Sequence, residues 1–131
     1  MIYFGSFLFG VISSLSLPPF NVLMSIFLIV VPIYNACKES EKSLTRAIFI
    51  IGSFSFGWFL ISLHWISSAL LVGSKYQLIL IPFALILIPL YMSLYWILAS
   101  FLSFILFKNF EARFISTLNF IGFSEILRSK F

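Results

Sequence analysis

Apolar stretches separated by short polar ones make up almost the whole of this chain. Charged residues and prolines divide it into five apolar segments, each of which predicts a helix. The predicted helices span residues 2–17, 20–36, 47–72, 76–107 and 114–131. Pro18 and Pro19 end the first helix, because consecutive prolines lack backbone donors and disfavour helix before them. Gly73, Ser74 and Lys75 predict a tight turn between the third and fourth helices.

The predicted helices have lengths suited to a membrane. The first is about 24 Å long, slightly short of a ~30 Å hydrocarbon core. The third is long enough to cross with tilt. The fourth, at about 48 Å, is longer than the core is thick, and Pro82 and Pro89 predict kinks in it. The pattern therefore predicts an all-α membrane protein, in which residues 1–131 form one transmembrane domain of about five helices.

Composition supports the membrane class, and the charges indicate an orientation. Of the 131 residues, 62% are hydrophobic and 9% are charged, and a soluble domain this small could not bury so much apolar surface. Basic residues gather in the polar stretches 38–46 and 108–113, whereas the other two loops hold only Lys75. The positive-inside rule places the N-terminus and both basic stretches in the cytoplasm. The net charge of +4 is spread thinly, so no nucleic-acid partner is predicted.

Pairs of small residues four positions apart occur in several predicted helices. This spacing lets helix backbones approach closely in lipid, and it predicts ordinary packing within a bundle. The pairs are Ser6 with Gly10, Ser53 with Gly57, and Ala99 with Ser103.

His64 is the only histidine of the sequence and falls inside the third predicted helix. A titratable group at membrane depth is a functional candidate. The alternative interpretation is a neutral imidazole that is hydrogen-bonded to a neighbouring helix, because no carboxylate or second ligand accompanies it in the sequence. Trp65, beside it, fits an aromatic belt at the membrane interface.

Two further groups of residues are candidates for a site. Tyr91, Tyr95 and Trp96 form an aromatic patch after Pro89, which either lines a lipid-facing groove or serves packing and interface anchoring. Glu125 and Arg128 are three residues apart on one helix face and can therefore pair. The pair is either a local ion pair at the membrane surface or a polar anchor for an external domain or a lipid headgroup.

Features of an autonomous catalytic centre are missing from the sequence. It contains no nucleophile paired with a base, no glycine-rich phosphate loop and no metal-ligand spacing, so no catalytic residue, metal or cofactor is predicted. Cys37 is the only cysteine and has no basic or histidine partner nearby in the sequence. The first four segments contain no carboxylate, which argues against a proton-coupled transporter.

Four stretches nevertheless follow one another in a familiar order and spacing. They are Leu-Ser-Leu-Pro-Pro-Phe-Asn at 15–21, Gly-Trp-Phe-Leu-Ile-Ser-Leu-His-Trp-Ile at 57–66, Leu-Tyr-Met-Ser-Leu-Tyr at 90–95, and Ser-Glu-Ile-Leu-Arg at 124–128. Together they resemble the first five membrane helices of the apolipoprotein N-acyltransferases.

This resemblance implies a definite activity. Enzymes of that family move an acyl chain from a phospholipid to the α-amino group of the diacylglyceryl-cysteine of a bacterial apolipoprotein. They act through a thioester on a cysteine in an external nitrilase-like domain. The implied partners are the phospholipid acyl donor, the diacylglyceryl-apolipoprotein and membrane lipids, and the implied location is the bacterial inner membrane, crossed several times. The sequence ends before that catalytic domain, so we expect a fragment or truncated product that is inactive alone.

The resemblance also suggests roles for the candidate residues. Glu125 and Arg128 would position the catalytic domain or contact a headgroup. The residues that would border a lipid entry are His64, Trp65, Tyr91 and Tyr95. A different class is the alternative: a small non-enzymatic membrane protein that acts as an oligomer, such as a transporter half or an assembly factor. Solute flux in liposomes and a stable homo-oligomer in mild detergent would distinguish it.

Overall fold

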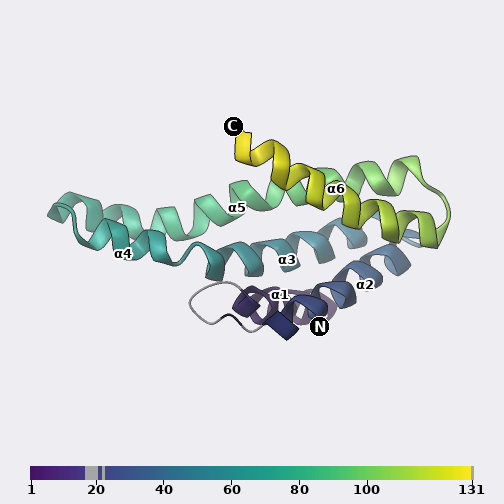
Figure 1. Cartoon of the computed structure of the whole chain (residues 1–131), viewed down its shortest axis with the longest axis horizontal. Coiled ribbons are helices and arrows are strands. Elements are labelled where there is room, and N and C mark those ends of the chain that lie inside the picture. Colours follow the sequence, from purple (N-terminus) through teal and green to yellow (C-terminus); the bar gives the residue numbers. More distant parts are fainter. Residues whose placement is uncertain (17–20, 22, 131) are drawn as a thin grey trace.

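The computed structural model describes residues 1–16, 21 and 23–130, and every regular element in this part is helical (Figure 1). The predicted fold class is therefore confirmed. The predicted turn at Pro18 and Pro19 lies outside the described residues. The helices are α1 (Ile2–Ser13), α2 (Val30–Ser40), α3 (Leu44–Ser62), α4 (Trp65–Leu71), α5 (Lys75–Leu106) and α6 (Phe110–Lys130), with 3₁₀ segments η1 (Ser14–Ser16) after α1 and η2 (Leu23–Ile29) before α2.

Three helical stretches in the described part are long and apolar enough to cross a membrane. They are Leu23–Ser40, which joins η2 to α2, then Leu44–Ser62 and Lys75–Leu106. The stretch Ile2–Ser16 is apolar but shorter. α6 has 21 residues, but it carries charged residues in its first and last turns and does not fall among the three. The count of about five crossings thus stays a prediction for α1 and α6.

Several helix ends differ from the prediction, because polar residues extend the helices. α2 continues to Ser40, α3 begins at Leu44 and α6 begins at Phe110, so the polar stretch 38–46 contains only a short turn. Charged side chains at a helix end reach water without leaving the helix, and Lys38 in the last turn of α2 also suits the helix dipole. α5 runs through both Pro82 and Pro89 as one helix of 32 residues.

The predicted single helix over 47–72 is wrong, because the structure divides it into α3 and α4. Leu63 leaves the helical conformation at φ −101° and ψ 6°. Side chains at the break bond to nearby backbone carbonyls: His64 Nδ1 lies 2.6 Å from the oxygen of Ile61, and Ser67 Oγ donates to the oxygen of His64 at 2.6 Å. Such local bonds compete with the helical ladder and favour an interruption.

α3 lies in the middle of the bundle, in contact with α1, α2 and α5, while α6 packs on α5 and α2 (Figure 1). Arg113 on α6 donates from Nη1 to Ser40 Oγ on α2 at 3.0 Å, so the polar stretches 38–46 and 108–113 share one end of the bundle. We call this the basic end. Tyr3 packs on Phe49 near the same end, with ring centroids 6.2 Å apart, which agrees with the predicted orientation. The core of fully buried apolar side chains includes Ile33, Ala36, Cys37, Ala47, Ile50, Ile51 and Phe54.

Two glycines allow α1 and α3 to cross in close contact. A Cβ atom on Gly10 would meet the carbonyl oxygen of Phe54 and lie 2.9 Å from the backbone nitrogen of Trp58. A Cβ atom on Gly57 would lie 2.5 Å from the carbonyl oxygen of Phe7. The close approach predicted from small-residue spacing is thus confirmed for these helices.

α4 and the first half of α5 form a hairpin that extends beyond the other helices (Figure 1). α5 is about 48 Å long, whereas α3 is about 28 Å long. Large apolar side chains on this hairpin are exposed, among them Val72, Tyr76, Ile79, Phe83 and Leu87. The hairpin therefore presents an apolar surface that no other described part of the chain covers.

A cluster of hydroxyl groups joins α5 to α6 near the basic end. Thr117 Oγ1 donates to the carbonyl oxygen of Arg113 at 2.6 Å and lies 2.9 Å from Ser103 Oγ. Ser103 Oγ also lies 2.5 Å from Ser116 Oγ. All three hydroxyl side chains are buried, where water does not reach them. The hydrogen bonds within the cluster therefore supply the partners that water would otherwise provide.

Thr117→Val tests this cluster. Valine keeps the shape of threonine but removes the hydroxyl, so we expect a loss of ~1 kcal/mol in the free energy of unfolding. Thermal unfolding in detergent measures it. Asn119→Ala, an exposed substitution on the same helix, serves as the control and should change the stability by less than about 0.5 kcal/mol. Equal stability of both variants and the unmodified protein would contradict a stabilising role for the cluster.

Candidate functional site

Glu125 and Arg128 lie near the end of α6 that is opposite the basic end. Arg128 Nη2 donates to Glu125 Oε2 at 2.5 Å, so the predicted pairing is confirmed. Each side chain is 31% exposed, which makes this a partly buried ion pair. Helical spacing of three residues brings the two groups together without help from other helices.

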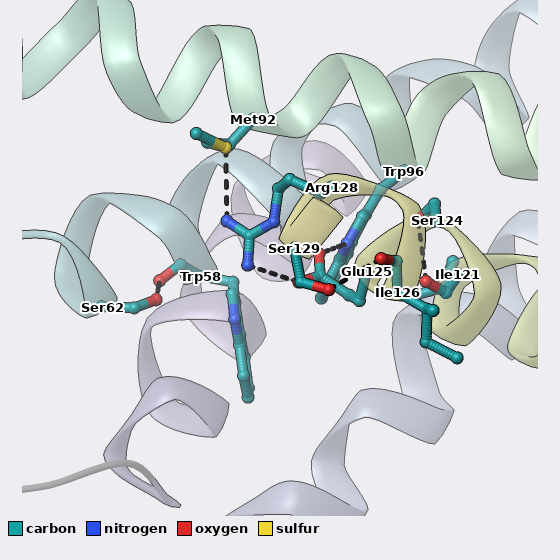
Figure 2. A network of polar contacts seen from close by, with 10 residues as sticks. All are labelled: Trp58, Ser62, Met92, Trp96, Ile121, Ser124, Glu125, Ile126, Arg128 and Ser129. Atoms are coloured by element: carbon teal, nitrogen blue, oxygen red, sulfur yellow. Dashed lines mark hydrogen bonds and ion pairs between the residues drawn. The ribbon is translucent and has the colours of Figure 1, made fainter. Parts of the chain in front are cut away.

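Trp96 on α5 completes the coordination of the Glu125 carboxylate. Its Nε1 donates to Glu125 Oε1 at 2.6 Å, so each carboxylate oxygen accepts one bond (Figure 2). The Trp96 side chain is 4% exposed. It packs among the rings of Phe54, Trp58 and Phe59 on α3, with centroids 5.7, 6.0 and 5.1 Å away. Packing therefore fixes the indole, and the indole fixes the carboxylate.

The sequence predicts Trp96 in an aromatic patch but not its bond to Glu125, which is 29 residues away. A signal was available in the small residues Ser93, Ser100 and Ser103, which share its side of α5 and are buried. That spacing indicates the buried face of the helix. The partner of the indole depends on how α6 folds back on α5, which no local pattern gives.

The guanidinium of Arg128 has weak and incomplete partners apart from Glu125. Its Nη1 donates to the sulfur of Met92 at 3.3 Å, and a thioether is a weak acceptor. The guanidinium carbon lies 5.5 Å from the ring centroid of Phe59, within the range of a cation–π contact. Its Nε is buried and has no hydrogen-bond partner within the described residues. Nη1, which is held only by the thioether, can therefore donate to a stronger acceptor that approaches.

A hollow of about 250 Å³ lies beside this pair, between the end of α3 and the helices α5 and α6. Figure 2 shows side chains of α5 and α6 converging on the pair, with Trp58 of α3 beside them. The lining residues are Trp58, Phe59, Ser62, Leu63, Trp96, Glu125 and Arg128. The charges of Glu125 and Arg128 compensate each other, so the hollow offers hydrogen-bond donors and aromatic surface without net charge. Such an arrangement binds and positions groups.

Of the remaining predicted residues, His64, Tyr91 and Tyr95 do not line this hollow. His64 is exposed, and the bond of its Nδ1 to the oxygen of Ile61 lies within its own turn. The alternative that predicted a bond to a neighbouring helix is therefore wrong. The side chain of Trp65 lies outside what the structure describes. Tyr91 and Tyr95 approach each other on α5, with hydroxyl oxygens 3.0 Å apart.

Tyr95 instead borders a second hollow, of about 330 Å³, between α5 and α6. Its lining is apolar apart from the Tyr95 hydroxyl and Ser124. Tyr95 and the Glu125–Arg128 pair thus line different hollows. Cys37 on α2 is fully buried in the core and makes no disulfide. It lines neither of the two hollows.

Comparisons with known proteins agree with the resemblance seen in the four sequence stretches. The family model of the apolipoprotein N-acyltransferase N-terminal domain matches residues 9–131. A curated relative, the apolipoprotein N-acyltransferase of Rhodopseudomonas palustris, is 32% identical over 123 residues, which are 91% of this chain and 23% of the relative. This chain thus spans less than a quarter of that relative's length. No solved structure matches the chain.

Proposed function

Since this chain belongs to the apolipoprotein N-acyltransferase family, we propose that it supplies the N-terminal membrane part of an enzyme that transfers an acyl chain from a phospholipid to a diacylglyceryl-apolipoprotein. In this proposal it crosses the bacterial inner membrane several times. The family match over residues 9–131 carries the proposal, and the three membrane-length stretches support it. The nucleophile would belong to another part of the enzyme, and this part would anchor it near both lipid-borne substrates.

Glu125 and Arg128 would position the catalytic domain in this proposal. They lie opposite the basic end, which is the outer end under the positive-inside rule. The bond from Trp96 holds the carboxylate, while Arg128 Nη1 has a thioether partner that a stronger acceptor can replace. A backbone carbonyl or carboxylate of the domain could accept a bond from this donor, and water-poor surroundings would strengthen the bond.

The lipid-entry role is proposed for the regions around His64 and Trp65 and around Tyr91 and Tyr95. Exposure of His64 and Tyr91 and the apolar hollow beside Tyr95 support it. In this proposal the break at Leu63 is a point of movement between α3 and α4.

A chimeric enzyme tests the positioning role. This chain replaces the matching N-terminal part of the R. palustris relative, and N-acylation of a diacylglyceryl peptide is measured in liposomes. Glu125→Ala and Arg128→Ala should lower kcat by about tenfold or more per folded enzyme, because small misplacements of reacting groups are costly. The control is Ser129→Ala, an exposed neighbour that should leave kcat unchanged.

Two outcomes would contradict these proposals, and each excludes a different one. Unchanged rates in both charge variants would exclude the positioning role while leaving the family function intact. A chimera that inserts stably but transfers no acyl group would exclude the proposal that this chain can serve as the membrane part.

A further inference from the structure

The hollow between α5 and α6 is an open apolar groove. α5 contributes Tyr95, Leu98 and Leu102, and α6 contributes Phe120, Phe123 and Leu127. From Tyr95 to Leu102 it follows α5 for about 10 Å. Its volume is about 330 Å³.

The groove opens towards the surface that the helices present to lipid. Leu98 is 60% exposed and Phe123 is 58% exposed. Leu98 belongs to α5, which is long and apolar enough to cross a membrane, and Phe123 faces the same groove from α6. With α5 in the bilayer, hydrocarbon rather than water surrounds both side chains. Apolar hollows do not hold water, and an empty one forfeits dispersion contacts along its walls. A flexible apolar chain is therefore the natural filler of this groove.

A pair of tyrosine hydroxyls lies at one end of the groove and favours an apolar chain that carries a hydrogen-bond acceptor. Tyr91 and Tyr95 share a hydrogen bond of 3.0 Å, which uses one of their two hydroxyl protons. The other proton has no acceptor within the described residues, so the pair can donate one further bond. Helix side chains lean towards the helix N-terminus, so these hydroxyls point away from the basic end.

The depth of the tyrosines suits the ester region of a lipid. Tyr91 lies 15 residues before Leu106, which places it about 23 Å along α5 from the helix end at the basic side. In a ~30 Å hydrocarbon core this is the outer part of the leaflet remote from the basic end. The aliphatic part of the groove then extends from the tyrosines towards the middle of the bilayer.

We propose that the α5–α6 groove binds one acyl chain of a bilayer phospholipid, with the Tyr91–Tyr95 pair donating a hydrogen bond to the ester carbonyl of that chain. The ester carbonyl has free lone pairs and lies at the depth of the tyrosines, so it can accept this bond. The occupant is a bound lipid, and no acyl-transfer step is attributed to it. The proposal deepens the lipid-entry role proposed for Tyr91 and Tyr95 and rests on it, but it does not depend on the role of Glu125 and Arg128, which face the other hollow.

Photocrosslinking tests the groove. The unmodified chain is reconstituted in nanodiscs with phosphatidylcholine that carries a diazirine in one acyl chain, and mass spectrometry maps the adducts. Adducts should concentrate at Leu98, Leu102 and Phe123. Leu98→Trp fills the groove and should lower the adduct yield there about fivefold, which corresponds to ~1 kcal/mol of binding free energy. Leu94→Trp is the matched control, an exposed leucine one turn away that does not line the groove, and should leave the yield unchanged.

A second comparison tests the hydroxyl pair. The unmodified chain should bind an ester-linked phospholipid more tightly than its ether-linked analogue, which lacks the carbonyl. The double variant Tyr91→Phe and Tyr95→Phe should lose this preference.

Equal adducts at Leu94 and Leu98 would mean unselective surface lipid, and an absence of adducts at Leu98 would mean that another protein segment fills the groove. Either result would overturn the proposal, as would equal binding of ester and ether lipids to the unmodified chain.

Discussion

Gly10→Leu is expected to remove most of the correctly folded protein from the membrane. The two backbones meet at Gly10, where even a Cβ atom would overlap the carbonyl oxygen of Phe54. The rest of a leucine side chain has no space between α1 and α3, so the helices must separate. Overpacking of this kind costs ~3 kcal/mol, and the lost contacts of α1 with the central helix add to it.

Gly5 provides a matched control for this substitution. It lies on the same helix, and a Cβ atom there would meet nothing within 4 Å. Gly5→Leu should therefore express and run in detergent size-exclusion chromatography like the unmodified protein. Fluorescence-detected chromatography of both variants measures the folded fraction. A folded Gly10→Leu protein would mean that α1 does not need its close approach to α3.

Glu125→Ala is expected to cost ~2 kcal/mol in the free energy of unfolding, because it leaves the Arg128 guanidinium with a thioether and an aromatic ring as its described partners. Fully buried pairs lose more when broken, but both side chains here are 31% exposed, so solvent screens part of the effect. Trp96→Phe removes the indole donor and part of a buried ring, and it should cost about 2 kcal/mol.

A double-mutant cycle separates the pair from its surroundings. Glu125→Ala with Arg128→Ala should destabilise less than the sum of the two single substitutions, because the second substitution removes the charge that the first leaves unpaired. Urea unfolding in detergent micelles supplies the four free energies. Simple additivity would show that the contact contributes nothing to stability.

The sequence predicted those features that depend on local spacing. Glu125 and Arg128 pair because three residues separate them on one helix, and Gly10 and Gly57 allow close packing because they lack side chains. The membrane class follows from composition. Each of these inferences needs only a single helix or the average property of the chain.

Features that depend on how distant helices meet could not be predicted in the same way. The bond between Trp96 and Glu125 and the groove beside Tyr95 exist because α6 folds back along α5. The break at Leu63 was missed for a different reason. An uninterrupted apolar pattern indicates burial or lipid contact, but it does not show where His64 and Ser67 bond to the backbone.

The length of α5 has a consequence for the membrane around the protein. Covering its apolar surface completely in a ~30 Å core would require a tilt above the usual range of about 0–40°. A bilayer that covers the α4–α5 hairpin must therefore be locally thicker there than beside the shorter α1. Lipids around this protein would then experience a lateral gradient of thickness, with stretched chains on one flank and relaxed chains on the other.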